Sequence, residues 1–125
     1  MRLIAVCWLL FVLFSGYGCR DQTVEEAAAQ MTGGSPAKGK IAIAHYGCGS
    51  CHVIPGVAGA KAMVGPPLAQ IADRIYIGGV VTNTPSNMVQ WLQHPRSIDP
   101  KTAMPDVGLK EQEARDIASY LYTLQ

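Results

Sequence analysis

The stretch Cys48-Gly49-Ser50-Cys51-His52 decides how this sequence is interpreted. Two cysteines separated by two residues and followed directly by histidine form the pattern by which a pair of thiols adds across the vinyl groups of a haem. This spacing lets one turn of chain reach both vinyl groups, and it places the histidine ring beneath the iron. The sequence therefore predicts one covalently bound haem c, attached through Cys48 and Cys51, with His52 as an iron ligand.

Three other interpretations of the motif each lack a necessary part. A structural zinc site needs four ligands, and without a second cysteine pair His45 and His94 would have to complete it at unusual spacing. A thioredoxin-like dithiol needs a strand-helix-strand context, which the helical pattern of this chain does not provide. A disulfide between Cys48 and Cys51 would leave His52 unexplained.

The second axial ligand must be chosen mainly among methionines. Met31 lies in a polar segment, Met63 lies on a Gly-Ala loop close behind the motif, and Met88 has the spacing of a core residue. Met104 differs, because residues 102–105 form an extended segment far downstream, where the chain could cross the far face of the haem. A thioether favours ferrous iron and raises the reduction potential, so we expect Met104 to be the sixth ligand. The bis-histidine alternatives are His45 and His94.

The first 18 residues have the composition of an export signal. Arg2 precedes an unbroken apolar run over residues 3–14, and small residues follow it. Because a membrane-spanning helix needs roughly 20 apolar residues, a permanent transmembrane segment is the weaker interpretation. We therefore expect residues 1–18 to be a signal peptide and the mature chain to be exported.

Cys19 resembles the cysteine that bacterial lipoproteins acylate and expose as the first residue of the mature chain. Gly16 departs from that pattern, because lipoprotein signals usually carry Leu there, and ordinary cleavage near Gly18 is the alternative. We expect lipid on Cys19 and a location on the periplasmic side of the cytoplasmic membrane. Residues 19–36, polar and then rich in Gly, Ser and Pro, predict a flexible tether with at most a helical turn or two.

Charge limits the classes of partner. Once Arg2 leaves with the signal, basic and acidic residues balance, so the mature chain is formally neutral. A neutral protein lacks the basic surface that nucleic-acid binding requires. Recognition of redox partners should depend on local patches and show a shallow salt dependence.

Apolar residues at helical spacing predict an all-α domain over residues 37–125. A first helix should begin near Ala37 and end at Gly47, and a short second helix should cover residues 68–75. A third should run over residues 85–93, with a threonine N-cap and a proline at its first position. Such short helices, joined by long loops, bury little apolar surface, so a porphyrin would complete the core.

The last helix has the clearest pattern. Glu111 and Glu113 stand in its first turn, where carboxylates favour a helix. Apolar residues then recur three and four positions apart, which predicts an amphipathic helix that packs against the first one. These residues are Ala114, Ile117, Ala118, Leu121 and Leu124.

Together these features resemble the class I cytochromes c, in particular the small bacterial domains that occur alone or attached to oxidases. The similarity covers residues 37–124 and rests on the attachment motif, Gly65-Pro66-Pro67-Leu68, the methionine loop and the final helix. It implies the cytochrome c fold, with three to four short helices and long loops around one haem. It also implies transfer of single electrons and no enzymatic chemistry.

The resemblance implies roles for three further residues. The carbonyl of Pro66 would accept a hydrogen bond from the second ring nitrogen of His52. Arg74 would approach one haem propionate, with a solvated surface arginine as the alternative. Trp91 would donate its indole N–H to the other propionate, with core packing as the alternative. Tyr76 is a weaker candidate for the same role as Trp91.

The function expected from the sequence is single-electron transfer with His/Met ligation in a periplasmic or membrane-attached respiratory chain. The redox partners would be proteins such as a terminal oxidase or a dehydrogenase. One alternative is a haem subunit of a larger oxidase or dehydrogenase complex. The other is a haem enzyme or gas sensor with an open sixth site.

Overall fold

The structure, a computed structural model, describes residues 18–125, and it describes side chains from residue 23 onward. The predicted signal peptide, apart from Gly18, therefore lies outside the described residues. The helices are α2 (Gly18–Thr32), α3 (Pro36–His45), α4 (Pro85–Gln93), α5 (Pro95–Ile98) and α6 (Glu111–Leu121), with 3₁₀ turns η1 (Cys48–Ser50) and η2 (Ile71–Asp73). Two short strands, β1 (Tyr76–Ile77) and β2 (Val81–Thr82), form an antiparallel pair. The predicted all-α class is confirmed.

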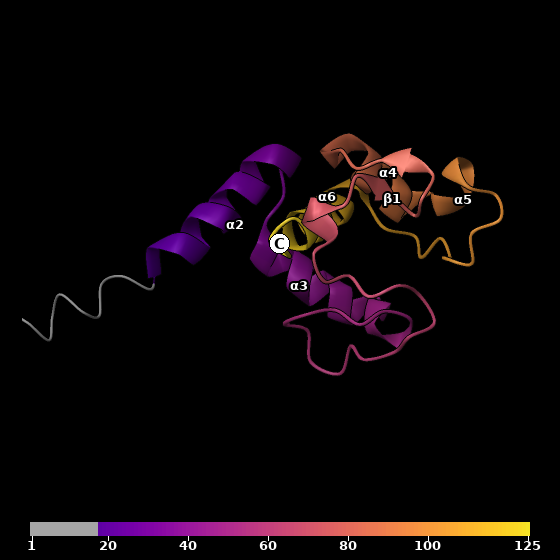
Figure 1. Cartoon of the computed structure of the whole chain (residues 1–125), viewed down its shortest axis with the longest axis horizontal. Coiled ribbons are helices and arrows are strands. Elements are labelled where there is room, and N and C mark those ends of the chain that lie inside the picture. Colours follow the sequence, from indigo (N-terminus) through magenta and orange to yellow (C-terminus); the bar gives the residue numbers. More distant parts are fainter. Residues whose placement is uncertain (1–17) are drawn as a thin grey trace, which may run out of the picture.

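The crossing of α3 and α6 is the centre of the fold (Figure 1). A Cβ atom on Gly39 of α3 would overlap the backbone carbonyl of Asp116 on α6, so only glycine permits this closeness. Ile43, Ala114 and Ile117 are almost fully buried around the contact. The prediction that the last helix packs against the first is confirmed.

The helix α2 replaces the flexible tether predicted for residues 19–36. Ala28 and Thr32 are buried on it, and the Thr32 hydroxyl donates to the Ala28 carbonyl at 2.9 Å. The helix ends where Gly33 adopts a left-handed φ of 69°. The tether prediction relied on the absence of an apolar stripe, but small residues can dock a helix closely without one.

The third helix agrees with its predicted bounds. Thr84 accepts a hydrogen bond from the backbone N–H of Asn87 at 3.2 Å, and Pro85 occupies the first turn of α4. Its apolar face is buried through Met88, Val89, Trp91 and Leu92. The proline that ends α4 also begins α5, which the sequence pattern did not predict.

The second predicted helix, over residues 68–75, is wrong. Only the single 3₁₀ turn η2 forms there, because Gln70 has a left-handed φ of 54° before it and Arg74 is extended after it. The chain then enters β1, pairing Tyr76 with Thr82 across the strands. Within residues 18–125, no helix combines the length and apolar character needed to cross a bilayer.

Candidate haem-binding site

The attachment motif forms a compact turn directly after α3. Gly47 begins the turn with a left-handed φ of 70°, a conformation that glycine adopts without strain. The backbone N–H groups of Cys51 and His52 then both donate to the carbonyl of Cys48, at 3.2 and 3.0 Å. Cys48 and Cys51 are free, half-buried thiols, and burial raises the pKa of Cys48. One turn thus carries both thiols and the histidine.

The ring of His52 is held by the segment around residue 65. Its Nδ1 lies 2.7 Å from the carbonyl oxygen of Pro66. A carbonyl can only accept, so Nδ1 carries the proton and Nε2 remains as the basic nitrogen. The hydrogen bond that the resemblance implied is present. Gly65 lies against the ring, where any Cβ atom would overlap it, and its N–H donates to the Cys51 carbonyl at 2.7 Å.

Arg74 binds the loop that carries Pro66. Its Nη2 donates to the carbonyl of Pro67 and, at 3.1 Å, to that of Ala69. The side chain is therefore partly buried and bonded to backbone, which differs from the solvated arginine considered as the alternative. Whether it also approaches a propionate stays a prediction. The contacts themselves show that Arg74 braces the loop that orients His52.

Two residues that the sequence did not single out hold Arg74 in turn. The side-chain amide of Asn83 donates to the carbonyl of Arg74 at 2.9 Å, and its oxygen accepts from the Tyr122 hydroxyl at 2.7 Å. Burial raises the pKa of Tyr122 to about 12, so the phenol remains a hydrogen-bond donor even at pH values where an ordinary tyrosine ionises. The end of α6 is thereby connected to the loop beside His52. No sequence pattern marks these contacts, because their acceptors are mostly backbone carbonyls.

Trp91 packs into the core, with its ring against the backbone of Gly78. The residue is 8% exposed, which agrees with the core-packing alternative. Its indole N–H has no hydrogen-bond partner among the described residues, and it is not among their fully buried unpaired atoms. The propionate role of Trp91 therefore stays a prediction.

Met104 lies half-buried on the loop between α5 and α6, packed against the core. Its backbone N–H donates to the Thr102 hydroxyl at 3.2 Å, which fixes the local turn. The other candidate methionines lie in different surroundings. Met88 is 2% exposed within the core, whereas Met63 is 83% exposed. Met31 is also exposed, on α2 and not on a tether.

The histidine alternatives are both at the surface. His94 lies 3.1 Å from the carboxylate of Asp106, and His45 contacts the Tyr46 ring edge-on at 5.1 Å between centroids. Over residues 18–125, no group of three or more His, Cys, Asp or Glu side chains is placed to hold a metal ion. The described part of the chain therefore offers no set of side chains for the structural zinc site considered above.

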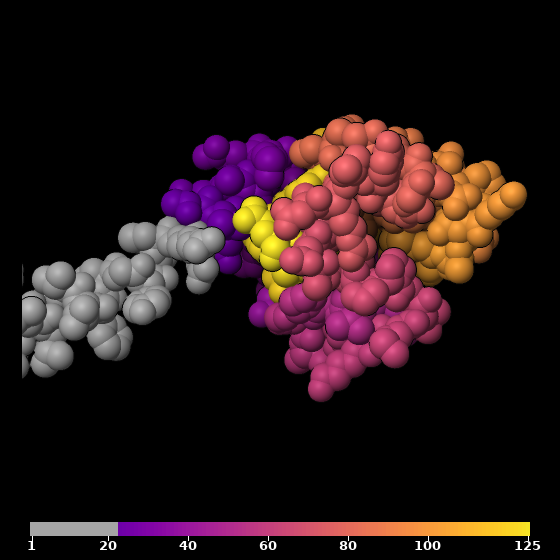
Figure 2. Space-filling view, viewed as in Figure 1, coloured from indigo at the N-terminus to yellow at the C-terminus, as the bar shows by residue number. Residues whose placement is uncertain are grey.

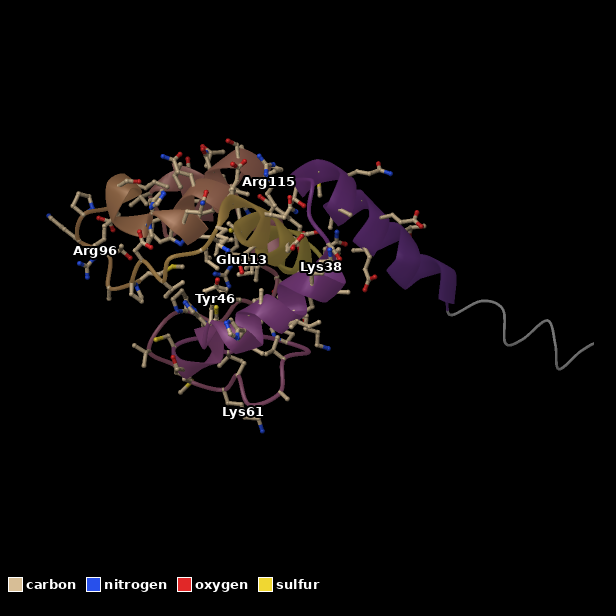
Figure 3. The ribbon with its side chains drawn as sticks, turned by 180° about the vertical axis from the view of Figure 1, so that it is seen from behind. Lys38, Tyr46, Lys61, Arg96, Glu113 and Arg115 are labelled. Atoms are coloured by element: carbon tan, nitrogen blue, oxygen red, sulfur yellow. The ribbon has the colours of Figure 1, made fainter. Side chains whose placement is uncertain are left out.

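Tyr46 and Glu113 connect the motif end of α3 to the start of α6 (Figure 3). The Tyr46 hydroxyl donates to Glu113 Oε2 at 2.8 Å, and the backbone N–H of Lys110 donates to the same oxygen at 3.0 Å. These hydrogen bonds lower the pKa of Glu113, and the bond to Glu113 raises the pKa of Tyr46. The carboxylate thus fixes the helix pair beside the attachment turn.

The space-filling view shows a hollow in the face of the molecule that is seen in Figure 1 (Figure 2). It opens between the magenta part of the chain, which contains the attachment motif, and the orange part, which precedes Met104. A free basic nitrogen on His52, two adjacent half-buried thiols and a half-buried thioether have the donor chemistry of a mono-haem site. The residues present therefore fit a covalently bound haem.

Small all-α architecture and this donor set define a mono-haem protein of the c type. The chain belongs to the cytochrome c family, whose model, Cytochrome c, matches residues 36–125. Neither the curated proteins nor the solved structures contain a significant match to the chain. Membership means that the protein carries a covalently bound haem c, which contains iron, and that it works in haem-based electron transfer. Members of the family are in general electron carriers.

Proposed function

We propose that this protein carries single electrons through one haem c attached to Cys48 and Cys51, with His52 and Met104 as axial ligands. The hydrogen bond between His52 Nδ1 and the Pro66 carbonyl supports the proposal most directly. It leaves the opposite ring nitrogen free to ligate, and it fixes the plane of the imidazole.

The residues of the site would hold the haem and set its electronic properties, each in a different way. The haem supplies an iron that alternates between the ferrous and ferric states. The Pro66 carbonyl makes the His52 imidazole a stronger electron donor by accepting a hydrogen bond from its Nδ1–H. Met104 would offer a neutral, soft sulfur that favours the ferrous state. Trp91 and Arg74 would donate hydrogen bonds to the propionates, and Arg74 also holds the loop of Pro66 in place.

The cellular setting belongs to the same proposal. The apolar run over residues 3–14 and Cys19 support export and attachment of the mature chain to the periplasmic side of the cytoplasmic membrane by lipid. The partners would be membrane redox proteins of a respiratory chain, such as a terminal oxidase or a dehydrogenase. The formally balanced charge of the mature chain predicts that their association depends weakly on salt.

Absorption spectra of the full chain test the ligand set. The protein would be produced in a periplasm with haem-attachment machinery, and oxidised, reduced and carbon-monoxide-treated spectra would be recorded. We expect a low-spin c-type spectrum that carbon monoxide does not change, and a Met104→Ala variant that binds carbon monoxide. A Met63→Ala variant is the control, since that methionine is exposed. Carbon monoxide binding by the unaltered protein would instead indicate an enzyme or sensor with an open sixth site.

A further inference from the structure

Side chains on one face of α6 donate hydrogen bonds to the C-terminal end of α2. The guanidinium of Arg115 donates to the Thr32 carbonyl at 3.0 Å, and the side-chain amide of Gln112 donates to the Gly33 carbonyl at 3.1 Å. These carbonyls stand at the C-terminus of α2, where a helix leaves its last acceptors unpaired. Glu111 holds the same guanidinium through bonds of 3.1 and 2.7 Å (Figure 3 shows Arg115).

The chain that leaves α2 is held just as closely. The backbone N–H of Ser35 donates to Asp116 Oδ1 at 2.8 Å, and Asp116 is buried. Gly34 lies against the backbone of Arg115, where a Cβ atom would overlap it. The junction between α2 and α3 is therefore fixed to α6 by side chains on one side and by backbone contact on the other.

The helix itself also packs on the domain. Ala28 and Thr32 are 1% and 2% exposed, and α2 contacts both α6 and α4. Its N-terminal part, by contrast, extends beyond the domain (Figure 1). In that view α2 projects from one end of the molecule, while α5 and the orange segment that follows it lie at the other end. The hollow of Figure 2 opens on the half of the molecule away from α2.

From these contacts we infer that α2 is a rigid spacer that holds the haem domain at a fixed height and orientation above a lipid bilayer, with the haem-bearing half directed away from it. The inference rests on the proposed membrane attachment, either by lipid on Cys19 or by retention of the apolar residues 3–14. Cys19 lies in the first turn of α2, roughly 14 Å along the helix from Ala28. As a flexible coil the same nine residues would have a root-mean-square span of roughly 16 Å and no fixed direction.

Hydrogen exchange of the full holoprotein tests whether α2 is docked. Amides of residues 23–32 should be protected, and Arg115→Ala should reduce that protection about tenfold, the factor expected when a charged hydrogen bond is lost. The matched control is Arg96→Ala, which removes an exposed arginine from α5 and should leave α2 unchanged. Unprotected α2 amides in the unaltered protein would overturn the inference.

Energy transfer on vesicles tests the height. The full chain would be bound to phosphatidylcholine vesicles that contain a fluorescent headgroup lipid, with the haem as acceptor. The unaltered protein should give one well-defined distance of closest approach between the haem and the plane of the labelled headgroups. Ala27→Pro should break the helix at an exposed position and broaden the distribution of heights, without touching α6. Equal distributions for the two proteins would overturn the spacer role.

The outcomes separate the spacer from the attachment on which it rests. Mass spectrometry of the mature N-terminus distinguishes lipid on Cys19 from a retained residue 1–18 segment. A chain that does not bind vesicles overturns the membrane attachment and the spacer role together. A chain that binds vesicles while its α2 amides exchange freely overturns the spacer alone. Binding with a protected α2 and one well-defined distance of closest approach supports both.

Discussion

The α3–α6 crossing and the loops around His52 reach order by different means. At the crossing, Gly39 brings two helix backbones into direct contact, and the surrounding side chains are almost fully buried. In residues 47–70 the side chains are mostly half-buried or exposed, and order comes from backbone hydrogen bonds such as Gly65 to Cys51. The comparison shows that the crossing is closed by contacts within the chain, whereas the loops bury few apolar side chains of their own, so we expect a bound haem to supply the apolar contacts that they lack.

The largest effect should come from adding one carbon at the crossing. Gly39→Ala would place a Cβ atom on the Asp116 carbonyl, which cannot move without separating the helices. We expect a loss of about 3 kcal/mol or failure to fold, measured by thermal denaturation. Gly59→Ala, at a left-handed position in open space, should cost only about 1 kcal/mol. Equal losses in the two variants would contradict the contrast between the regions.

Removal of the haem should affect the loops next. A Cys48→Ala, Cys51→Ala double variant cannot form the thioether bonds to the haem. The loops would then lose the porphyrin that we expect to cover their apolar side chains. We expect helical circular dichroism to persist while amides over residues 53–70 exchange much faster than those of α3 and α6. Ser50→Ala, which keeps both thiols, is the control. Uniform loss of protection over the whole domain would show that the crossing also depends on the cofactor.

A smaller effect is expected from the glycine beneath the histidine ring. Gly65→Ala should push the His52 imidazole and lengthen its hydrogen bond to the Pro66 carbonyl. We expect a weaker bond between His52 and the haem iron and a changed reduction potential of the haem. The free energy of unfolding should fall by about 1–3 kcal/mol. Gly59→Ala serves again as the control. An unchanged potential would mean that the ring orientation does not depend on this glycine.

The smallest effect should come from the link between the two regions. Tyr46→Phe removes the hydroxyl that donates to Glu113. Because the pKa of Glu113 is lowered from 4.5, this bond stabilises the fold above about pH 4.5 and is lost as pH falls. Because the pKa of Tyr46 is raised from 10.0, the stabilisation is present below about pH 10 and is lost above it.

Thermal melts against pH would measure this link. The unaltered protein and Tyr46→Phe should differ by a small shift in melting temperature between those limits, and the difference should shrink beyond each of them. Tyr76→Phe, at an exposed tyrosine, should show no such dependence. A difference that stays constant down to acid pH would exclude Glu113 as the partner that matters.

Local chemistry could be predicted from the sequence, and long-range backbone contacts could not. The attachment motif, the bounds of α4 and the bond from His52 to Pro66 all involve short spacing or a family pattern. The helix α2 was missed because it docks through small residues and through acceptors at its own C-terminus. The 68–75 helix was wrongly predicted because apolar spacing does not report the left-handed Gln70. Arg74 binds backbone carbonyls, which no residue pattern identifies.

The hydrogen bonds between α6 and the α2–α3 junction also determine where this domain could be joined to another protein. The family match begins at residue 36, yet Arg115 and Gln112 have their acceptors at residues 32 and 33. A fusion that joined another protein at residue 36 would remove these two backbone acceptors, leaving Arg115 bonded only to Glu111 and Gln112 only to Asp116, and it would uncover the surface that Ala28 buries. For this chain, the unit that can be inherited or transplanted intact is therefore longer than the segment that its family shares.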